Sequence, residues 1–345
     1  MKRKMLWLRL ILSGGLLLFL LSTVDLQQTI TALQHSNGYF LLVALVVALV
    51  DRVLMAYKWN ILLKAKGIRI PLLNLTATYI KTTFLGLFLP ATVGGDALRA
   101  YAVSKQGVSG NDVVSSIVVE RALGFIALFI FVLVSMILSI FVFGQTFFAG
   151  MWNLFWIFLL LLVVSTVGIM VSLNDKFLRR LLKVLEARNI HVQNYRLVAK
   201  LGEVYRSYTN YRHNRSQLGG FLVLSLLENL FPLVWTYFLS LAFNIEVPLL
   251  YFFILIPIVL VLVRLPISLD GFGIQEGTFV YFLGLIGVDG SQAFLLGFVS
   301  HLLAILSVLP GGLLYALGGL GSDPGSRLER QTRLDNLADA SGESG

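Results

Sequence analysis

Long apolar runs constrain the fold of this chain more than any other feature. Six runs approach or exceed the roughly 20 residues that a helix needs to cross a bilayer. Inside hydrocarbon every backbone N–H and C=O has to be paired within the protein, which leaves helices and closed barrels as spanning structures. The chain is also only 13% charged, whereas about 25% of the residues in soluble domains are charged. We therefore expect spanning helices at about 6–24, 39–57, 113–143, 152–172, 219–243 and 292–318.

Two further apolar regions are interrupted by motifs that resemble each other. Residues 90–96 read Pro-Ala-Thr-Val-Gly-Gly-Asp, and residues 266–276 read Pro-Ile-Ser-Leu-Asp-Gly-Phe-Gly-Ile-Gln-Glu. The second motif leaves helical pieces of about 16 and 12 residues, or roughly 24 and 18 Å. Neither piece crosses a hydrocarbon core of about 30 Å alone. The sequence therefore predicts broken-helix hairpins in the regions 72–90 and 249–287.

Basic residues indicate the orientation of the chain, because Lys and Arg near the ends of spans resist translocation. Both termini are expected in the cytoplasm, in a multi-pass protein of the cytoplasmic membrane. The proposed outer loops, none of which contains Lys or Arg, are 25–38, 144–151, 244–248 and 288–291. With this parity the first hairpin enters the membrane from inside and the second from outside. Re-entrant hairpins of opposite sense are typical of an inverted repeat whose motifs meet near the midplane.

The expected fold is thus all-α and polytopic, with about six spanning helices and two re-entrant hairpins in one membrane domain over residues 1–320. Residues 321–345 are expected to form a disordered cytoplasmic tail. The cytoplasmic segment 174–217 holds ten basic and three acidic residues. It is either a positive-inside signal alone, or an amphipathic segment whose basic residues 176–215 also attract anionic lipid headgroups. Its tyrosines are spaced as on a helix in the membrane interface: Tyr205, Tyr208 and Tyr211.

Charged residues inside predicted spans are candidates for function, because burying a charge in a bilayer is costly. Two acid–arginine pairs, Asp51-Arg52 and Glu120-Arg121, lie near the cytoplasmic side. They either line a polar vestibule or are interfacial charges that pair between helices.

Glu228 falls near the middle of its predicted span, and Pro232 follows four residues later. The proline ring clashes with the carbonyl of residue 228, which predicts a kink beside a buried carboxyl. Glu228 serves either in charge or proton coupling, or as a structural partner of Arg121 or Arg264. His301 has a comparable depth and is either a proton partner or a packing residue.

Each glycine motif combines flexible backbone with charge, which suits an anion site such as one for phosphate. In the first motif a helix that begins near Asp96 would direct its positive end at the ligand. Arg99, one turn further, either contacts the ligand or only pairs with Asp96. The candidate binding residues are Pro90, Gly94, Gly95, Asp96, Arg99, Glu120, Arg121, Arg264, Gly271, Gly273 and Glu276. The candidate coupling residues are Asp51, Arg52, Glu228, Asp270 and His301.

Other kinds of chemistry lack a signature in this sequence. There is no cysteine, no phosphate-binding loop of the Walker type and no histidine cluster with metal-ligand spacing. No Ser/His/Asp set shares one predicted side of the membrane. We expect no cofactor, no metal, no nucleic-acid partner and no catalytic residues.

The residues from Leu89 to Asp96, Arg99, Glu120-Arg121 and the second motif together resemble a known family. It is the flippase-like membrane region of lysylphosphatidylglycerol synthases and its stand-alone relatives, and the resemblance covers roughly residues 10–320. It implies movement or presentation of lipids with modified headgroups, with the first motif and Glu276 as functional positions. The aminoacyl transferase domain of the full synthases is absent from this sequence, so lysine transfer is not expected.

Three hypotheses follow for the function. The leading one is a flippase that moves an anionic or headgroup-modified (aminoacylated or glycosylated) lipid from the inner to the outer leaflet. Without a nucleotide site, uphill movement would draw on an ion gradient or on removal of product. The alternatives are an integral membrane transferase with Asp96 or Glu276 as base, and a non-catalytic partner of such an enzyme. A homo-oligomer or a complex with a lipid-modifying enzyme is compatible with each.

Overall fold

The computed structural model describes residues 26–89, 93–150, 152–173, 195–265 and 270–320, together with Gly15, Phe19, Leu20, Ser22 and Ser268. Every regular element in these ranges is a helix, which confirms the all-α fold. Most of the span expected at 6–24, the segment 174–194 and the tail 321–345 lie outside the described residues.

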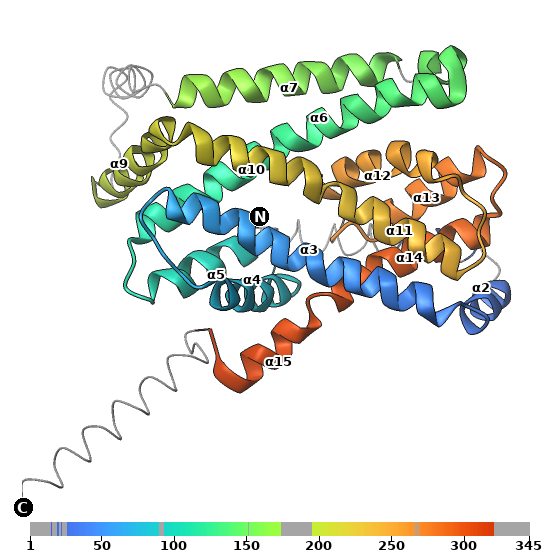
Figure 1. Cartoon of the computed structure of the whole chain (residues 1–345), viewed down its shortest axis with the longest axis horizontal. Coiled ribbons are helices and arrows are strands. Elements are labelled where there is room, and N and C mark those ends of the chain that lie inside the picture. Colours follow the sequence, from blue (N-terminus) through green and yellow to red (C-terminus); the bar gives the residue numbers. More distant parts are fainter. Residues whose placement is uncertain are drawn as a thin grey trace, which may run out of the picture.

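Five helical stretches among the described residues are long and apolar enough to cross a membrane. This confirms a polytopic membrane protein, and the stretches correspond to five of the predicted spans. They comprise α3 (Gly38–Lys64), α6 (Gly110–Gly150), α7 (Trp152–Ser172), α10 with α11 (Arg215–Glu228 and Leu230–Ala242), and α14 with α15 (Gly290–Leu306 and Leu309–Gly318). Figure 1 shows α3, α6, α7 and the α10–α11 pair running along the long axis of the molecule.

Prolines interrupt two of these stretches. The break between α10 and α11 falls at Asn229, next to Glu228, as Pro232 predicts. The run 292–318 was expected to be one helix, and the structure divides it at Ser307 and Val308. Pro310, in the first turn of α15, explains this second break, because it has no N–H for the carbonyl of Leu306, where α14 ends.

Both broken regions form pairs of short helices. The first pair is α4 (Leu72–Gly86) with α5 (Val93–Ser104), and the second is α12 (Leu249–Arg264) with α13 (Ile274–Gly284). The 16 and 11 residues of α12 and α13 match the predicted pieces, and each helix is too short to span alone. The pairs occupy opposite halves of the long axis (Figure 1). Their entry from opposite membrane faces stays a prediction.

The helix pair α4–α5 is covered on one side by α15, and the contact depends on a glycine. A Cβ added to Gly311 would lie 2.4 Å from the carbonyl oxygen of Ile80, so only glycine lets α15 approach α4 this closely. Lys81, also on α4, donates to the carbonyl of Gly319 at the end of α15. α15 is therefore held against the first hairpin at both of its ends.

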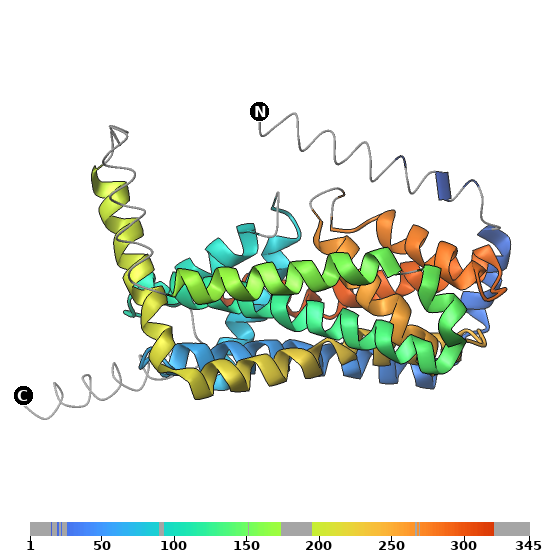
Figure 2. The same ribbon diagram turned by 90° about the horizontal axis from the view of Figure 1, so that it is seen from above.

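The smaller elements are α2 (Leu26–Gln34), α9 (Tyr195–Thr209) and a 3-10 helix, η1 (Asn210–His213). α9 stands out from the other helices at one end of the molecule (Figure 2). Tyr205 on α9 and Tyr211 on η1 bind the ends of neighbouring helices through their hydroxyls. The Tyr211 hydroxyl donates to the carbonyl of Leu62 at 2.9 Å, and the Tyr205 hydroxyl to that of Ser172 at 2.5 Å. The position of this segment in the membrane interface stays a prediction, and the helical spacing of the tyrosines did not show that their hydroxyls bind other helices.

Candidate functional site: a charged cavity between the two hairpins

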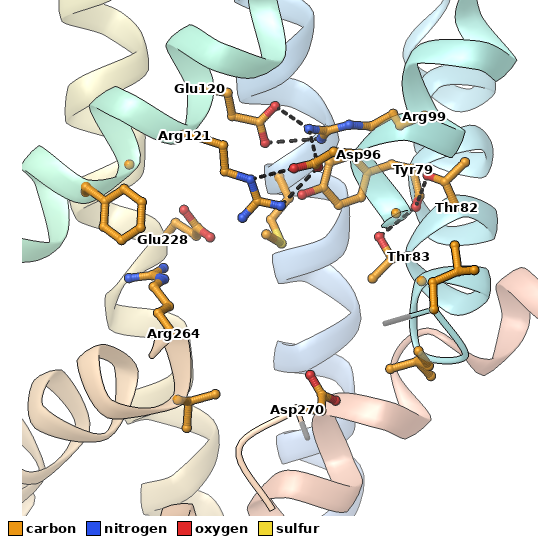
Figure 3. A pocket seen from close by; sticks show the side chains of 18 of the residues that line it. Tyr79, Thr82, Thr83, Asp96, Arg99, Glu120, Arg121, Glu228, Arg264 and Asp270 are labelled. Carbon is orange, nitrogen blue, oxygen red and sulfur yellow. Dashed lines mark hydrogen bonds and ion pairs between the residues drawn. The ribbon is translucent and has the colours of Figure 1, made fainter. Parts of the chain in front are cut away.

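A cavity of about 370 Å³ lies where the two broken helices face each other. The end of α4 and the start of α5 form one side, and the end of α12 with residues 268 and 270 forms another. α3, α6 and α10 close the remaining wall (Figure 3). The structure thus brings both sequence motifs to one cavity. The predicted site residues that line it are Gly95, Asp96, Arg99, Glu120, Arg121, Glu228, Arg264 and Asp270.

Asp96 is the centre of an ion-pair network on the α5–α6 side of the cavity. It lies in the first turn of α5, where a carboxylate is favoured by the helix dipole. Its Oδ2 accepts from Nε of Arg121 at 2.8 Å, and its Oδ1 accepts from Nη2 of Arg121 at 3.0 Å. Oδ1 also accepts from Nη2 of Arg99 at 3.2 Å. One carboxylate therefore fixes two arginines from two helices.

Arg99 is bound by side chains from three other helices, and its Nε has no hydrogen-bond partner in the described part of the chain. Its guanidinium donates a hydrogen bond from Nη1 to Oε1 of Glu120 at 3.1 Å, and its Nη2 lies 2.8 Å from Oε2 of the same carboxylate as an ion pair. The guanidinium also lies 4.4 Å from the ring centre of Trp59 and 4.8 Å from that of Tyr79. Its side chain is 3% exposed. Arg99 thus has little surface left for a ligand and joins α3, α4, α5 and α6.

Arg121 is more accessible, because its side chain is 51% exposed although it binds Asp96 through two nitrogens. It faces the cavity from α6 (Figure 3). A ligand phosphate could reach the remaining guanidinium nitrogen, Nη1, without breaking the Asp96 pair.

Glu228 has a partner that sequence reasoning missed. Its Oε2 accepts from Nζ of Lys58 on α3, and Lys58 is further oriented by Ser225 Oγ at 3.3 Å. The sequence predicted Arg121 or Arg264 in this role, because Lys58 lies just beyond the span expected at 39–57. Lys58 follows Asp51 by seven residues, or about two helical turns, so both lie on the same face of α3. This spacing could have indicated that Lys58 faces the protein interior.

Arg264 is the candidate residue whose cation is left available. Its side chain reaches the cavity from the last turn of α12 and lies toward Glu228 in Figure 3. Within the described ranges no carboxylate forms an ion pair with it, and the residue is exposed. Glu228 is already held by Lys58. The cavity therefore contains one guanidinium that a phosphate could bind through two hydrogen bonds.

The glycines of the first motif serve helix packing. A Cβ on Gly94 would lie 2.6 Å from Cβ of Leu89. A Cβ on Gly86 would come within 3.2 Å of the Cα of Gly95. α4 and α5 therefore cross closely at these positions. Their predicted role in presenting N–H groups to a ligand stays a prediction, and Pro90 lies outside the described residues.

The second motif forms a turn behind the cavity. Asp270, Gly271 and Gly273 have positive φ angles of 51°, 88° and 82°, which explains the two glycines. Glu276 was predicted to bind substrate, but its side chain is 0% exposed and does not line the cavity. Its Oε2 accepts from the N–H of Gly273 at 2.7 Å and Oε1 lies 3.1 Å from Nδ1 of His301.

The pair Asp51–Arg52 also lies off the cavity surface. Arg52 Nη2 is 3.7 Å from Asp51 Oδ2, and Arg52 Nε donates to Ser307 Oγ at 2.9 Å. Arg52 thus binds the break between α14 and α15. Of the two acid–arginine pairs that were predicted to line a polar vestibule, only Glu120 and Arg121 line the cavity.

Comparison with known proteins identifies the family of this chain. Residues 6–312 match the family described as the lysylphosphatidylglycerol synthase transmembrane region. The chain belongs to this family. The match includes both glycine motifs and all elements that line the cavity. The lysylphosphatidylglycerol synthase region relates the chain to lipid-modifying membrane proteins.

Two archaeal membrane proteins are similar to the chain. A UPF0104 membrane protein of Methanocaldococcus jannaschii is 23% identical over 254 residues, which cover 69% of this chain and 73% of that protein. A UPF0104 membrane protein of Pyrococcus horikoshii is 23% identical over 141 residues, 39% of this chain and 41% of that protein.

Proposed function

We propose that the protein is a flippase that moves an anionic or headgroup-modified lipid from the inner to the outer leaflet of the cytoplasmic membrane. One observation carries the proposal: two broken-helix hairpins contribute to one cavity, and Arg264 on one of them has no ion-pair partner among the described residues. Broken helices whose ends meet in one cavity are typical of transporter binding sites.

The cavity suits the headgroup of a lipid. Its volume of about 370 Å³ is at the lower end of the range for small-molecule sites, about 300–1,000 Å³. A phosphate fits the guanidinium of Arg264, with the exposed edge of Arg121 as a second donor. The carboxylate of Asp270, 49% exposed, is placed to receive a positive group such as the amine of an aminoacylated headgroup. The acyl chains would stay in the surrounding hydrocarbon.

The remaining charges of the cavity are paired within the protein. Lys58 neutralises Glu228, Arg99 neutralises Glu120, and Arg121 shares Asp96. An anionic headgroup therefore enters a site that is close to neutral except for Arg264 and Asp270. The headgroup therefore meets few unpaired charges in the cavity. This lowers the free-energy cost of moving it out of water, because no other unpaired anion except Asp270 is desolvated together with the phosphate.

We further propose that both termini are cytoplasmic and that the basic residues 176–215 attract anionic lipid headgroups. Such attraction amounts to about 1 kcal/mol per basic residue near the surface. It would concentrate the substrate at the cytoplasmic surface of the membrane. A lipid-modifying enzyme is the proposed source of a modified headgroup.

The test is lipid movement by the purified full chain in liposomes. A fluorescent phospholipid in the inner leaflet becomes accessible to an impermeant quencher when it is moved, and mass spectrometry shows whether it is unmodified. We expect unmodified lipid to move with the native protein and to move much more slowly with Arg264→Gln. The matched control is Arg69→Gln, an exposed arginine outside the cavity.

The outcome separates the hypotheses. Movement that Arg264→Gln abolishes and Arg69→Gln preserves supports transport through this cavity. A new lipid product would support the transferase alternative, and no movement over protein-free liposomes would count against transport.

A further inference from the structure

A buried histidine lies between two carboxylates just behind the cavity. Nδ1 of His301, on α14, is 3.1 Å from Oε1 of Glu276, and Nε2 is 3.9 Å from Oδ2 of Asp270. The ring of Phe272 stacks on the imidazole with centres 4.1 Å apart. The imidazole plane is thus fixed with one nitrogen directed at each carboxylate.

The two carboxylates differ in their access to water. Asp270 lines the cavity with a half-exposed side chain, whereas Glu276 is completely buried. His301 is buried as well. The three groups therefore form a chain that leads from the cavity, through the imidazole, to a carboxylate that the cavity does not reach directly.

No further charged group faces this chain from the described helices that pack against α14. α2, α11 and α15 contain no Asp, Glu, Lys or Arg. On α3, Arg52 binds Ser307, Asp51 lies against Arg52, and Lys58 binds Glu228. The neighbouring Ser300 is occupied by Trp235 and Thr236 of α11. On α13 the other titratable side chain, Tyr281, is exposed away from the core.

The buried carboxylate also holds the shape of the second motif. Glu276 Oε2 accepts from the N–H of Gly273, at the start of α13, and this closes the turn in which residues 270, 271 and 273 have positive φ. A hydrogen bond to an ionised carboxylate is roughly twice as strong as one to a neutral acceptor. Protonating Glu276 would therefore loosen the turn that joins α13 to α12 and Arg264.

We propose that Asp270, His301 and Glu276 form a proton-carrying relay that couples lipid movement to a proton gradient. A proton from the cavity binds the Asp270 carboxylate and passes to Nε2 of His301, while Nδ1 gives its proton to Oε1 of Glu276. One proton moves, Asp270 regains its charge and Glu276 becomes neutral. The proton returns by the same path and leaves from Asp270 when the cavity opens to the other side, so that Glu276 regains its charge. Because 3.9 Å exceeds hydrogen-bond distance, the exposed Asp270 side chain has to swing toward the imidazole or use one water.

This inference rests on the proposed transport function and adds the energy source. The test uses the full chain in liposomes that contain a pH-sensitive dye, and it records lipid movement and proton uptake together under an imposed pH gradient. We expect the native protein to take up protons as it moves lipid, and the gradient to change the rate. His301→Gln should still move lipid but without proton uptake and without response to the gradient.

Two further variants make the test decisive. His35→Gln, at an exposed histidine remote from the cavity, should behave as the native protein. Asp270→Asn changes a half-exposed side chain and, if His301→Gln does not fold, tests the relay through proton uptake alone, which it should abolish whatever its effect on the rate of lipid movement. Coupled proton uptake by His301→Gln or Asp270→Asn, or gradient-independent lipid movement by the native protein, would overturn the relay. The second of these results would leave the transport function standing, whereas no lipid movement at all would remove both.

Discussion

Lys58 and Glu228, 170 positions apart in the sequence, form an ion pair in the wall of the cavity. The pair joins α3 to the end of α10, next to the break at Asn229. Both side chains are largely buried, and Lys58 also lies 5.1 Å from the ring centre of Phe221. Each residue therefore offsets the cost of burying the charge of the other in the membrane region.

This relationship predicts a coupling free energy between the two positions. Lys58→Gln or Glu228→Gln alone should lower the free energy of unfolding by up to about 3 kcal/mol, because each leaves one buried charge unpaired. The double variant should lose clearly less than the sum of the two. Thermal stability in detergent measures all three, and strictly additive losses would show that the pair is not formed.

The two arginines of the cavity should respond differently to the same substitution. Arg99→Lys removes the hydrogen bond and the close guanidinium–carboxylate pairing with Glu120, and the contacts with Trp59 and Tyr79. We expect it to lower the free energy of unfolding by about 1.5–3 kcal/mol, the worth of a hydrogen bond to a charged group. Arg264 has no such partners in the described part of the chain, so Arg264→Lys should have the same melting temperature as the native protein.

The rate of lipid movement per folded molecule should show the opposite order, with Arg264→Lys more impaired than Arg99→Lys. Arg264→Lys keeps the charge but loses planar, two-bond recognition of a phosphate, so lipid movement should slow. Movement per folded molecule of Arg99→Lys should remain closer to native. Equal stability of the two variants would contradict the distinction drawn between them.

The sequence predicted those parts of the fold that depend on neighbours along the chain. The lengths of α12 and α13 and the break beside Glu228 follow from proline and glycine positions. The break at Ser307 had the same kind of signal in Pro310, but the continuous apolar run around it favoured one helix. The sense of the two hairpins in the membrane is still a prediction.

The site was less predictable because its pairing is tertiary. Asp96, Arg99, Glu120 and Arg121 were all identified, yet the division into an engaged Arg99 and an available Arg264 depends on Trp59, Tyr79 and Lys58. These three residues reach the site from α3 and α4, and no local pattern records which cation meets which carboxylate. Glu276 was assigned to the ligand from its motif and the family resemblance, and its burial could not be predicted because it depends on how α13 packs on α14.

Glycine at position 311 should be required for the seating of α15. In Gly311→Ala the new Cβ would meet the backbone of Ile80, which cannot move as a flexible side chain does. We expect a loss of about 1–3 kcal/mol in the free energy of unfolding, as for other overpacked positions. Gly168→Ala, in α7 with nothing within 4 Å of the added Cβ, is the matched control and should be neutral or slightly stabilising. Similar melting temperatures for the two alanine variants would mean that α15 moves away from α4 at little cost.

The opposite sense of the hairpins is tested by labelling, and the absence of cysteine from the sequence makes the experiment direct. Ser109 follows α5 and Glu246 precedes α12, and both are exposed. If the basic residues fix the orientation, an impermeant thiol reagent added outside intact cells should label Glu246→Cys and spare Ser109→Cys. Permeabilised cells should show labelling of both, which controls for accessibility. A second pair, Arg69→Cys before α4 and Ile286→Cys after α13, should repeat the pattern with Arg69 inside and Ile286 outside. Labelling of Ser109→Cys and Glu246→Cys from the same side would require an additional crossing between α5 and α12. The two breaks would then reach the cavity from one face of the membrane, and alternating access by opposed hairpins would be excluded.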